Sequence, residues 1–134
     1  MISFALAYPI ILIGGPADAE IANFVTEGCP HVKNLVGKID LDGSFQIIDQ
    51  ATLVIAHDTG MMHAAAALQK PILSIWGNTI PNFGMTPYYP KQAEVQSTMF
   101  EVDHLKCRPC SKIGFEKCVE VFSKKPSRAT YPRI

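Results

Sequence analysis

Short apolar runs that end in polar turns constrain the fold of this chain more than any other feature. The runs are "YPIILIGG", "TLVIAH" and "ILSIW". A continuous apolar run of this length, bounded by Gly, Pro or polar residues, is typical of a strand buried on both faces. Because helical patterns lie between such runs, the sequence predicts an α/β fold, a Rossmann-like parallel sheet with helices on both faces.

Two helical patterns follow these strands directly. In "ADAEIANFVTEG", Ile21, Phe24 and Val25 share one face, and Gly28 stands where the helix should end. "MMHAAAALQ" is rich in strong helix formers. The strand-like alternation of "AEVQSTMFEVD" predicts one more strand near the end of this region.

The stretch "NLVGKIDLDGSFQIIDQA" predicts two shorter elements. A brief strand is expected around Leu35 and Val36, followed by a turn. A short helix should then begin near Ser44, whose hydroxyl can cap it.

Composition limits the classes of protein that this chain can belong to. With 134 residues, 48% of them apolar, the chain suits one compact domain. It has no run of eighteen apolar residues, and its opening is interrupted by Pro9 without a basic segment before it, so neither a membrane span nor a signal peptide is expected. A cytoplasmic location is the expectation.

Charge is distributed unevenly along the chain. Residues 1–102 hold four Lys/Arg against nine Asp/Glu, whereas residues 103–134 hold eight against three. Such a basic end can be a solvated tail or can contact phosphate, anionic lipid or nucleic acid. Since no nucleic-acid-binding motif accompanies it, no nucleic acid partner is expected, while peripheral contact with the inner membrane stays open.

Three polar turns follow the predicted strands, and in a parallel sheet they should meet at one edge, where ligands of such folds bind. They are Gly14-Gly15-Pro16, His57-Asp58-Thr59-Gly60 and Gly77-Asn78-Thr79. "GGP" departs from the dinucleotide fingerprint G-x-G-x-x-G, and no P-loop Lys follows it, which disfavours oxidoreductases and kinases. Gly14 and Gly15 could still let a nucleotide approach the backbone closely.

The middle turn is the most informative. A helix starting at Gly60 would present the free backbone amides of residues 60 to 62, including Met61, to an anion such as phosphate. Thr59 can add a hydroxyl, and Asp58 can accept hydrogen bonds from sugar or ribose hydroxyls. Alternatively, Asp58 or Thr59 simply caps the helix.

Two further residues allow both a structural and a binding interpretation. His63 is either packed or in contact with a pyrophosphate. Asp18 is either a helix-start carboxylate, the slightly favoured option, or a ribose ligand. The tripeptide Asp-Thr-Gly also occurs in aspartic proteases, but there it needs a β-rich fold and a second copy, and this chain has neither a β-rich pattern nor a second copy.

The cysteines give a weak metal signal. Cys107, Cys110 and Cys118 lie within twelve residues, with His104 nearby. A structural zinc site usually needs four ligands in close-spaced pairs, so free thiols or a disulfide are together as plausible as zinc. Neither a metal nor a cofactor is expected.

Taken together, "ILIGGPAD", "NLVGKIDL", "VIAHDTGMMHAAAALQKPILSIWGNT" and "CRPC" resemble the carboxyl-terminal half of the heptosyltransferases, glycosyltransferase family 9, over roughly residues 10–118. The most specific part is the D-T-G-x-x-H helix start. The resemblance implies a two-domain GT-B architecture. It also implies inverting transfer of heptose from ADP-heptose to the lipopolysaccharide core, with a carboxylate as the base.

The resemblance also assigns roles to individual residues. It implies that Asp58 holds the donor sugar, that Thr59 and Gly60 bind pyrophosphate, and that His63 lies near it. Asp18 matches an acidic residue on the ribose, and the backbone of Ile39 matches the position that receives adenine.

The expected organisation is a Rossmann-like nucleotide-sugar-binding domain at 1–102, incomplete at its start, and a Cys-containing loop with a basic tail at 103–134. The acceptor-binding domain with the catalytic base, and a phosphate-binding Lys, are expected to be missing from this sequence. No catalytic residue is therefore assigned, and the chain by itself should be inactive. Alternatives are a non-catalytic nucleotide-binding or interaction module, a GT-B enzyme that uses another nucleotide-sugar, and a zinc-dependent interaction domain.

Overall fold

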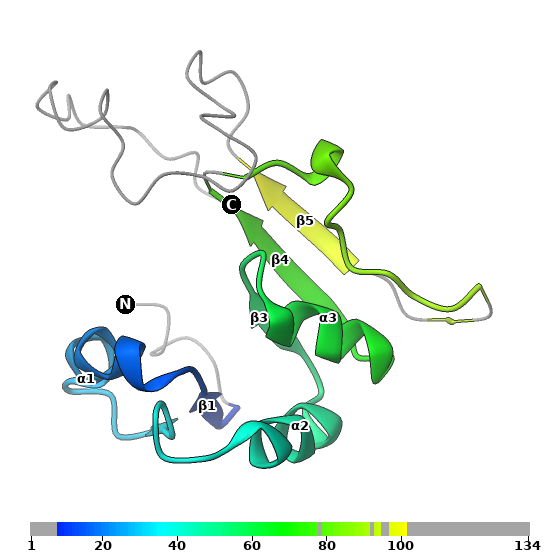
Figure 1. The fold of residues 1–134 in the computed structure, drawn as a ribbon. Helices are drawn as coiled ribbons and strands as arrows, with labels where there is room; N and C mark the ends of the chain where they lie inside the picture. The colour runs from blue at the N-terminus through cyan, green and yellow to red at the C-terminus, as the bar shows by residue number, and fades with distance from the viewer. Residues whose placement is uncertain (1–7, 78, 92, 95–96, 102–134) are drawn as a thin grey trace, which may run out of the picture. The chain divides into compact units, whose positions relative to one another are not determined.

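The chain forms two compact units, Met1–Ala51 and Thr52–Ile134, in a computed structural model that describes residues 8–77, 79–91, 93–94 and 97–101 (Figure 1). Unit 1 contains a two-stranded parallel sheet and unit 2 a three-stranded parallel sheet. Helices connect the strands in both units. The predicted α/β fold with parallel strands is therefore confirmed. Within the described residues, no helix is long and apolar enough to cross a membrane.

Unit 1 begins with a strand, a turn and a helix, as the sequence predicts. Its elements are β1 (Ile10–Leu12), the 3-10 helix η1 (Pro16–Asp18), α1 (Ala19–Thr26), β2 (Val32–Asn34) and α2 (Leu41–Gln50). β1 and β2 pair in parallel. The helix α1 ends just before Gly28, whose φ of +72° is a left-handed conformation that glycine adopts without steric cost.

The second strand of unit 1 lies earlier than predicted. β2 ends at Asn34, so the prediction of a strand around Leu35 and Val36 is wrong. The amide of Leu35 still donates to the carbonyl of Leu12, at 2.9 Å, but the amide of Val36 donates to Oδ1 of Asn34, at 3.0 Å. Since this local side-chain bond takes the backbone donor of Val36, the ladder ends there.

The apolar face of α1 is not buried within the structure. Ala22 is the buried residue of the helix, whereas Ile21, Phe24 and Val25 are all more than half exposed. Sheet A, formed by β1 and β2, has only two strands of three residues each. A surface of that size is too small to cover three large side chains, so helical periodicity predicted the helix correctly but not its burial.

The helix α2 has a different cap from the one expected. The prediction that Ser44 caps it is wrong, because the N-cap is Asp40, whose Oδ1 accepts from the amide of Gly43 at 2.8 Å. Ser44 lies inside the first turn, where its hydroxyl donates to the carbonyl of Asp40 at 2.9 Å. Asp is as good a cap as Ser, and it occurs earlier in the chain.

Unit 2 is built on one continuous parallel ladder. Its elements are β3 (Val54–Ala56), α3 (Gly60–Ala67), β4 (Ile72–Trp76), the 3-10 helix η2 (Pro81–Phe83) and β5 (Ser97–Glu101), in the strand order β3-β4-β5. Ala56 is paired with Ser74, and Trp76 with Glu101. α3 packs against β3 and β4 (Figure 1). The strands predicted from "TLVIAH", "ILSIW" and "AEVQSTMFEVD" are thus confirmed.

Among the described residues of unit 2, Ser74 is a polar residue buried in the core. Every second residue of β4, namely Ile72, Ser74 and Trp76, is at most 1% exposed. Nε1 of Trp76 donates to Oγ of Ser74 at 3.0 Å, and this hydroxyl contacts the carbonyl of Thr98 on β5 at 3.5 Å. The serine thereby gives the buried indole an acceptor and links β4 to β5.

Two of the three polar turns follow neighbouring strands of one sheet. Gly14-Gly15-Pro16 follows β1, which belongs to sheet A, while the turns after β3 and β4 belong to the three-stranded sheet. The prediction of a shared edge is therefore confirmed for the turns after β3 and β4, and for the turn after β1 it stays a prediction.

Replacing Asp40 by Ala should lower the unfolding free energy of unit 1 by about 1 kcal/mol, because α2 loses its cap. Asp40→Asn, which keeps an acceptor oxygen, should retain most of the stability. Urea denaturation followed by circular dichroism would measure both. A larger loss in Ser44→Ala than in Asp40→Ala would contradict the assigned cap.

Replacing Ser74 by Ala should destabilise unit 2 by about 1 to 3 kcal/mol, because it removes a buried acceptor of the indole. Trp76 is the single tryptophan of the chain, so its fluorescence reports the unfolding of this unit directly. Ser97→Ala is the matched control, since the described residues offer its hydroxyl no hydrogen bond. Equal midpoints for the two variants would refute the role of Ser74.

Candidate functional site

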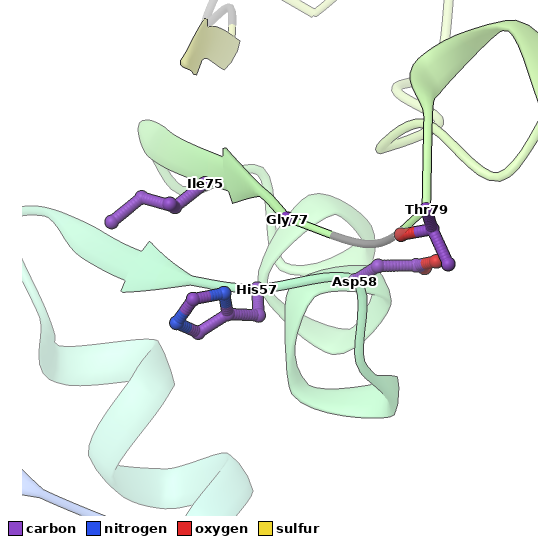
Figure 2. A pocket seen from close by; sticks show the side chains of 5 residues that line it. All are labelled: His57, Asp58, Ile75, Gly77 and Thr79. Atoms are coloured by element: carbon purple, nitrogen blue, oxygen red, sulfur yellow. The ribbon is translucent and has the colours of Figure 1, made fainter. Parts of the chain in front are cut away.

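The carboxyl ends of β3 and β4 form an open pocket of about 310 Å³ in unit 2. Because the two strands are parallel neighbours, the residues that follow them emerge at the same edge of the sheet. The pocket is lined by His57, Asp58, Ile75, Gly77 and Thr79 (Figure 2). The edge that the sequence analysis singled out for binding therefore carries a cavity.

Two kinds of side chain stand on opposite sides of this pocket. Figure 2 shows Asp58 and Thr79 together on one side, and His57 and Ile75 on the other. Gly77 lies between them, and a Cβ built on it would meet no atom within 4 Å. The first side offers carboxylate and hydroxyl oxygens, and the second offers a flat ring and an apolar chain.

The carboxylate of Asp58 is half-buried and makes no hydrogen bond with any residue that the structure describes. The N-cap of α3 is Thr59, yet its side chain makes no capping hydrogen bond. Neither of the two residues therefore performs the capping role that was the structural alternative. A partly buried carboxylate without a protein donor is a strong acceptor for ligand hydroxyls.

Beside Asp58, α3 begins with two unpaired backbone donors. Within the described part of the chain, the amides of Gly60 and Met61 have no acceptor. The amide of Met62 was expected to be free as well, but it donates to the carbonyl of Thr59 at 3.1 Å, as the first turn tightens. A Cβ added to Gly60 would meet no atom within 4 Å, so the helix start is open.

The remaining predicted residues of unit 2 are near this helix start without lining the pocket. Met61 is half-buried, and Thr59 and His63 are exposed. His63 follows the unpaired amides within the first turn of α3. Its imidazole is therefore solvent-accessible and does not belong to the core, which was the structural alternative for it.

In unit 1, the turn after β1 is held by its own hydrogen bonds. The amide of Gly15 donates to Oδ2 of Asp18 at 3.2 Å, and the carbonyl of Gly14 accepts from the amide of Gly37 at 3.0 Å. Asp18 thus has the structural role that was favoured for it. Ile39 is half-buried, and its backbone makes no hydrogen bond among the described residues. Ribose and adenine contacts of Asp18 and Ile39 stay predictions.

The cysteine cluster lies outside the described residues, and this includes Cys107, Cys110, Cys118 and His104. Within the described ranges, Cys29 forms no disulfide, and no group of three or more His, Cys, Asp or Glu side chains could hold a metal ion.

The long segment after β4 contributes to the pocket through Thr79. Its end is tied to unit 2 by Tyr89, whose hydroxyl donates to the carbonyl of Lys70 at 2.8 Å. Burial raises the pKa of the Tyr89 hydroxyl, which keeps it in the protonated, donating form.

Sequence reasoning did not assign His57, Ile75, Gly77 or Thr79 to the site. Three of them stood in the polar turns already identified, whereas Ile75 was counted only as part of an apolar strand. The strand register could have identified His57 and Ile75 as neighbours. Continuing the parallel pairing by one residue beyond Ala56 and Ser74 places His57 beside Ile75.

A protein-family model for glycosyltransferase family 9 (heptosyltransferase) matches residues 5–115. Among curated proteins, the chain is 29% identical over 112 residues to lipooligosaccharide heptosyltransferase 2 of Haemophilus influenzae, covering 80% of this chain and 32% of that protein. It is 32% identical over 93 residues to lipopolysaccharide heptosyltransferase 2 of Escherichia coli, covering 66% and 26%.

Solved structures agree with this similarity. A glycosyl transferase family 9 protein from Veillonella parvula superposes with a TM-score of 0.59 at 27% identity, covering 73% of this chain and 27% of that chain. The E. coli ADP-heptose lps heptosyltransferase II superposes with a TM-score of 0.57 at 26% identity, covering 69% and 28%. The chain spans about a third or less of the length of these proteins. Because the family model matches most of its residues, the chain belongs to glycosyltransferase family 9, the heptosyltransferases.

Proposed function

We propose that this chain is the donor-binding part of an inverting glycosyltransferase that transfers heptose from ADP-heptose to the lipopolysaccharide core. The observation that carries the proposal is the carboxylate of Asp58 in a pocket, next to the amides of Gly60 and Met61, all three without a hydrogen-bond partner among the described residues. The names of the relatives support the substrate class, since they are lipopolysaccharide and lipooligosaccharide heptosyltransferases, and one is an ADP-heptose enzyme.

The reaction breaks the bond between the anomeric carbon of the sugar and the diphosphate. Asp58 suits the sugar end of this bond, and the start of α3 suits the diphosphate end. Asp58 would accept hydrogen bonds from hydroxyls of the sugar and so fix the position of its anomeric carbon. Thr59 and the amides of Gly60 and Met61 would hold the diphosphate at the positive end of α3, with His63 nearby. As the bond to the sugar breaks, negative charge develops on the departing diphosphate, and these fixed donors would stabilise it.

The base that would deprotonate the acceptor hydroxyl is not assigned to any residue of this chain. An inverting transfer needs that base on the face of the sugar opposite the leaving diphosphate. Binding and deprotonation of the lipopolysaccharide acceptor are therefore proposed for the whole enzyme and not for the residues of this chain. The role proposed for the present residues is donor binding.

Calorimetric titration of the chain should show binding of ADP and ADP-heptose, with weaker binding of UDP and UDP-sugars. Asp58→Ala should weaken ADP-heptose binding roughly tenfold or more, because a hydrogen bond to a charged group is lost. Glu94→Gln, which neutralises an exposed carboxylate of the same unit, is the control and should bind like the wild type. Preference for UDP would point to another nucleotide-sugar, and unchanged affinity in Asp58→Ala would remove this residue from the site.

The 134-residue chain by itself should transfer no heptose to a lipopolysaccharide acceptor, because binding and leaving-group stabilisation do not replace the base. Product formation from ADP-heptose can be followed by mass spectrometry, with the E. coli heptosyltransferase 2 as the positive control. Turnover by the chain at a rate near that of the control enzyme would show that the base lies within these residues.

A further inference from the structure

The side of the pocket opposite Asp58 has no role in the proposed donor contacts. The parallel register pairs Ala56 with Ser74, so the next residues, His57 and Ile75, are neighbours on the same face of the sheet. Both side chains are exposed, Ile75 by 40%. Figure 2 shows both on the same side of the pocket, opposite Asp58 and Thr79.

The chemistry of these two side chains differs from that of the opposite side. An imidazole ring presents a flat aromatic surface, and the Ile75 side chain presents only C–H groups. Asp58 and Thr79 present oxygens instead. Small-molecule sites commonly combine an apolar surface with a few polar groups that fix the orientation of the ligand, and cavities of such sites measure about 300 to 1,000 Å³. The pocket, at about 310 Å³, is at the small end of that range.

A sugar ring matches this division of the pocket. Its hydroxyls lie around the edge, where a carboxylate can accept from them, while its faces carry C–H groups that pack on aromatic and aliphatic side chains. A phosphate group would gain nothing from Ile75. A metal ion would need a cluster of ligands, and the described residues contain none.

We propose that His57 and Ile75 form an apolar wall against which the C–H face of the donor sugar packs, and that this wall determines which sugar is accepted. The inference rests on the proposed function, in which a nucleotide-sugar binds at Asp58. It adds two residues that select the sugar by shape, whereas Asp58 orients it through hydroxyls.

The difference in affinity between ADP-heptose and ADP isolates the contribution of the sugar. Calorimetric titrations with both ligands should be made on the wild type, His57→Ala, His57→Phe and Ile75→Ala. Ile55→Ala is the matched control, because Ile55 lies two residues before His57 on the same face, is 57% exposed and does not line the pocket. It removes the same number of atoms as Ile75→Ala.

His57→Ala and Ile75→Ala should each weaken ADP-heptose binding by roughly fivefold and leave ADP binding unchanged. His57→Phe should keep most of the affinity, because it keeps the flat ring, and Ile55→Ala should behave like the wild type. Equal losses for ADP and ADP-heptose, no loss at all, or a His57→Phe variant as weak as His57→Ala would each overturn the inference. Failure of the wild type to bind ADP would instead overturn the proposed function, and with it the inference.

A second measurement follows ligand binding on the wild-type chain. The imidazole C–H signals of the wild-type chain can be recorded by NMR during titration with ADP and then with ADP-heptose. The signal of His57, assigned with the His57→Phe variant, should shift with ADP-heptose and not with ADP. A response that is the same for both ligands would place His57 away from the sugar.

Discussion

Parallel hydrogen bonding between β3 and β4 is the constraint on which the candidate site depends. In a parallel pair, both chains leave the sheet at the same edge, so the residues after Ala56 and after Trp76 are brought together although they are twenty positions apart in the sequence. The buried contact between Trp76 and Ser74 fixes the last residue of β4. Gly77 and Thr79 lie one and three residues after Trp76, so this packing helps to determine where they line the pocket.

The charges at this edge explain why it suits a ligand with both hydroxyls and phosphates. The start of α3 carries partial positive charge, and Asp58 carries a negative charge. Within the part of the chain that the structure describes, two amides of this helix start have no acceptor and the carboxylate has no donor. In many helices the side chain of the N-cap residue accepts a hydrogen bond from a free amide of the first turn, so donor and acceptor satisfy each other. Here the side chain of Thr59 does not do so, which leaves donors and acceptor to solvent or to a ligand.

Local patterns predicted the strands and helices well, because short apolar runs and Ala-rich segments determine such elements through nearest neighbours. Errors occurred where one side chain redirected the backbone. Asn34 captured the amide of Val36 and ended β2, and Asp40 capped α2 before Ser44 could. The burial of α1 could not be predicted either, since it depends on how much sheet surface the rest of the unit supplies.

The carboxylate of Asp58 was predictable from the sequence, whereas the apolar side of the candidate site was not, for a geometric reason. Asp58 and Thr59 stand out in the sequence because polar residues at the end of an apolar run need an explanation. Ile75 belongs to the apolar run itself, and its position in the pocket follows only from the register with β3. Since side chains alternate along a strand, a strand end supplies residues to both faces of the sheet edge. The last residues of an apolar strand therefore give the binding edge an apolar side, and the polar residues after the strand give it a polar side. A sugar has both C–H faces and hydroxyls, so its recognition uses both sides.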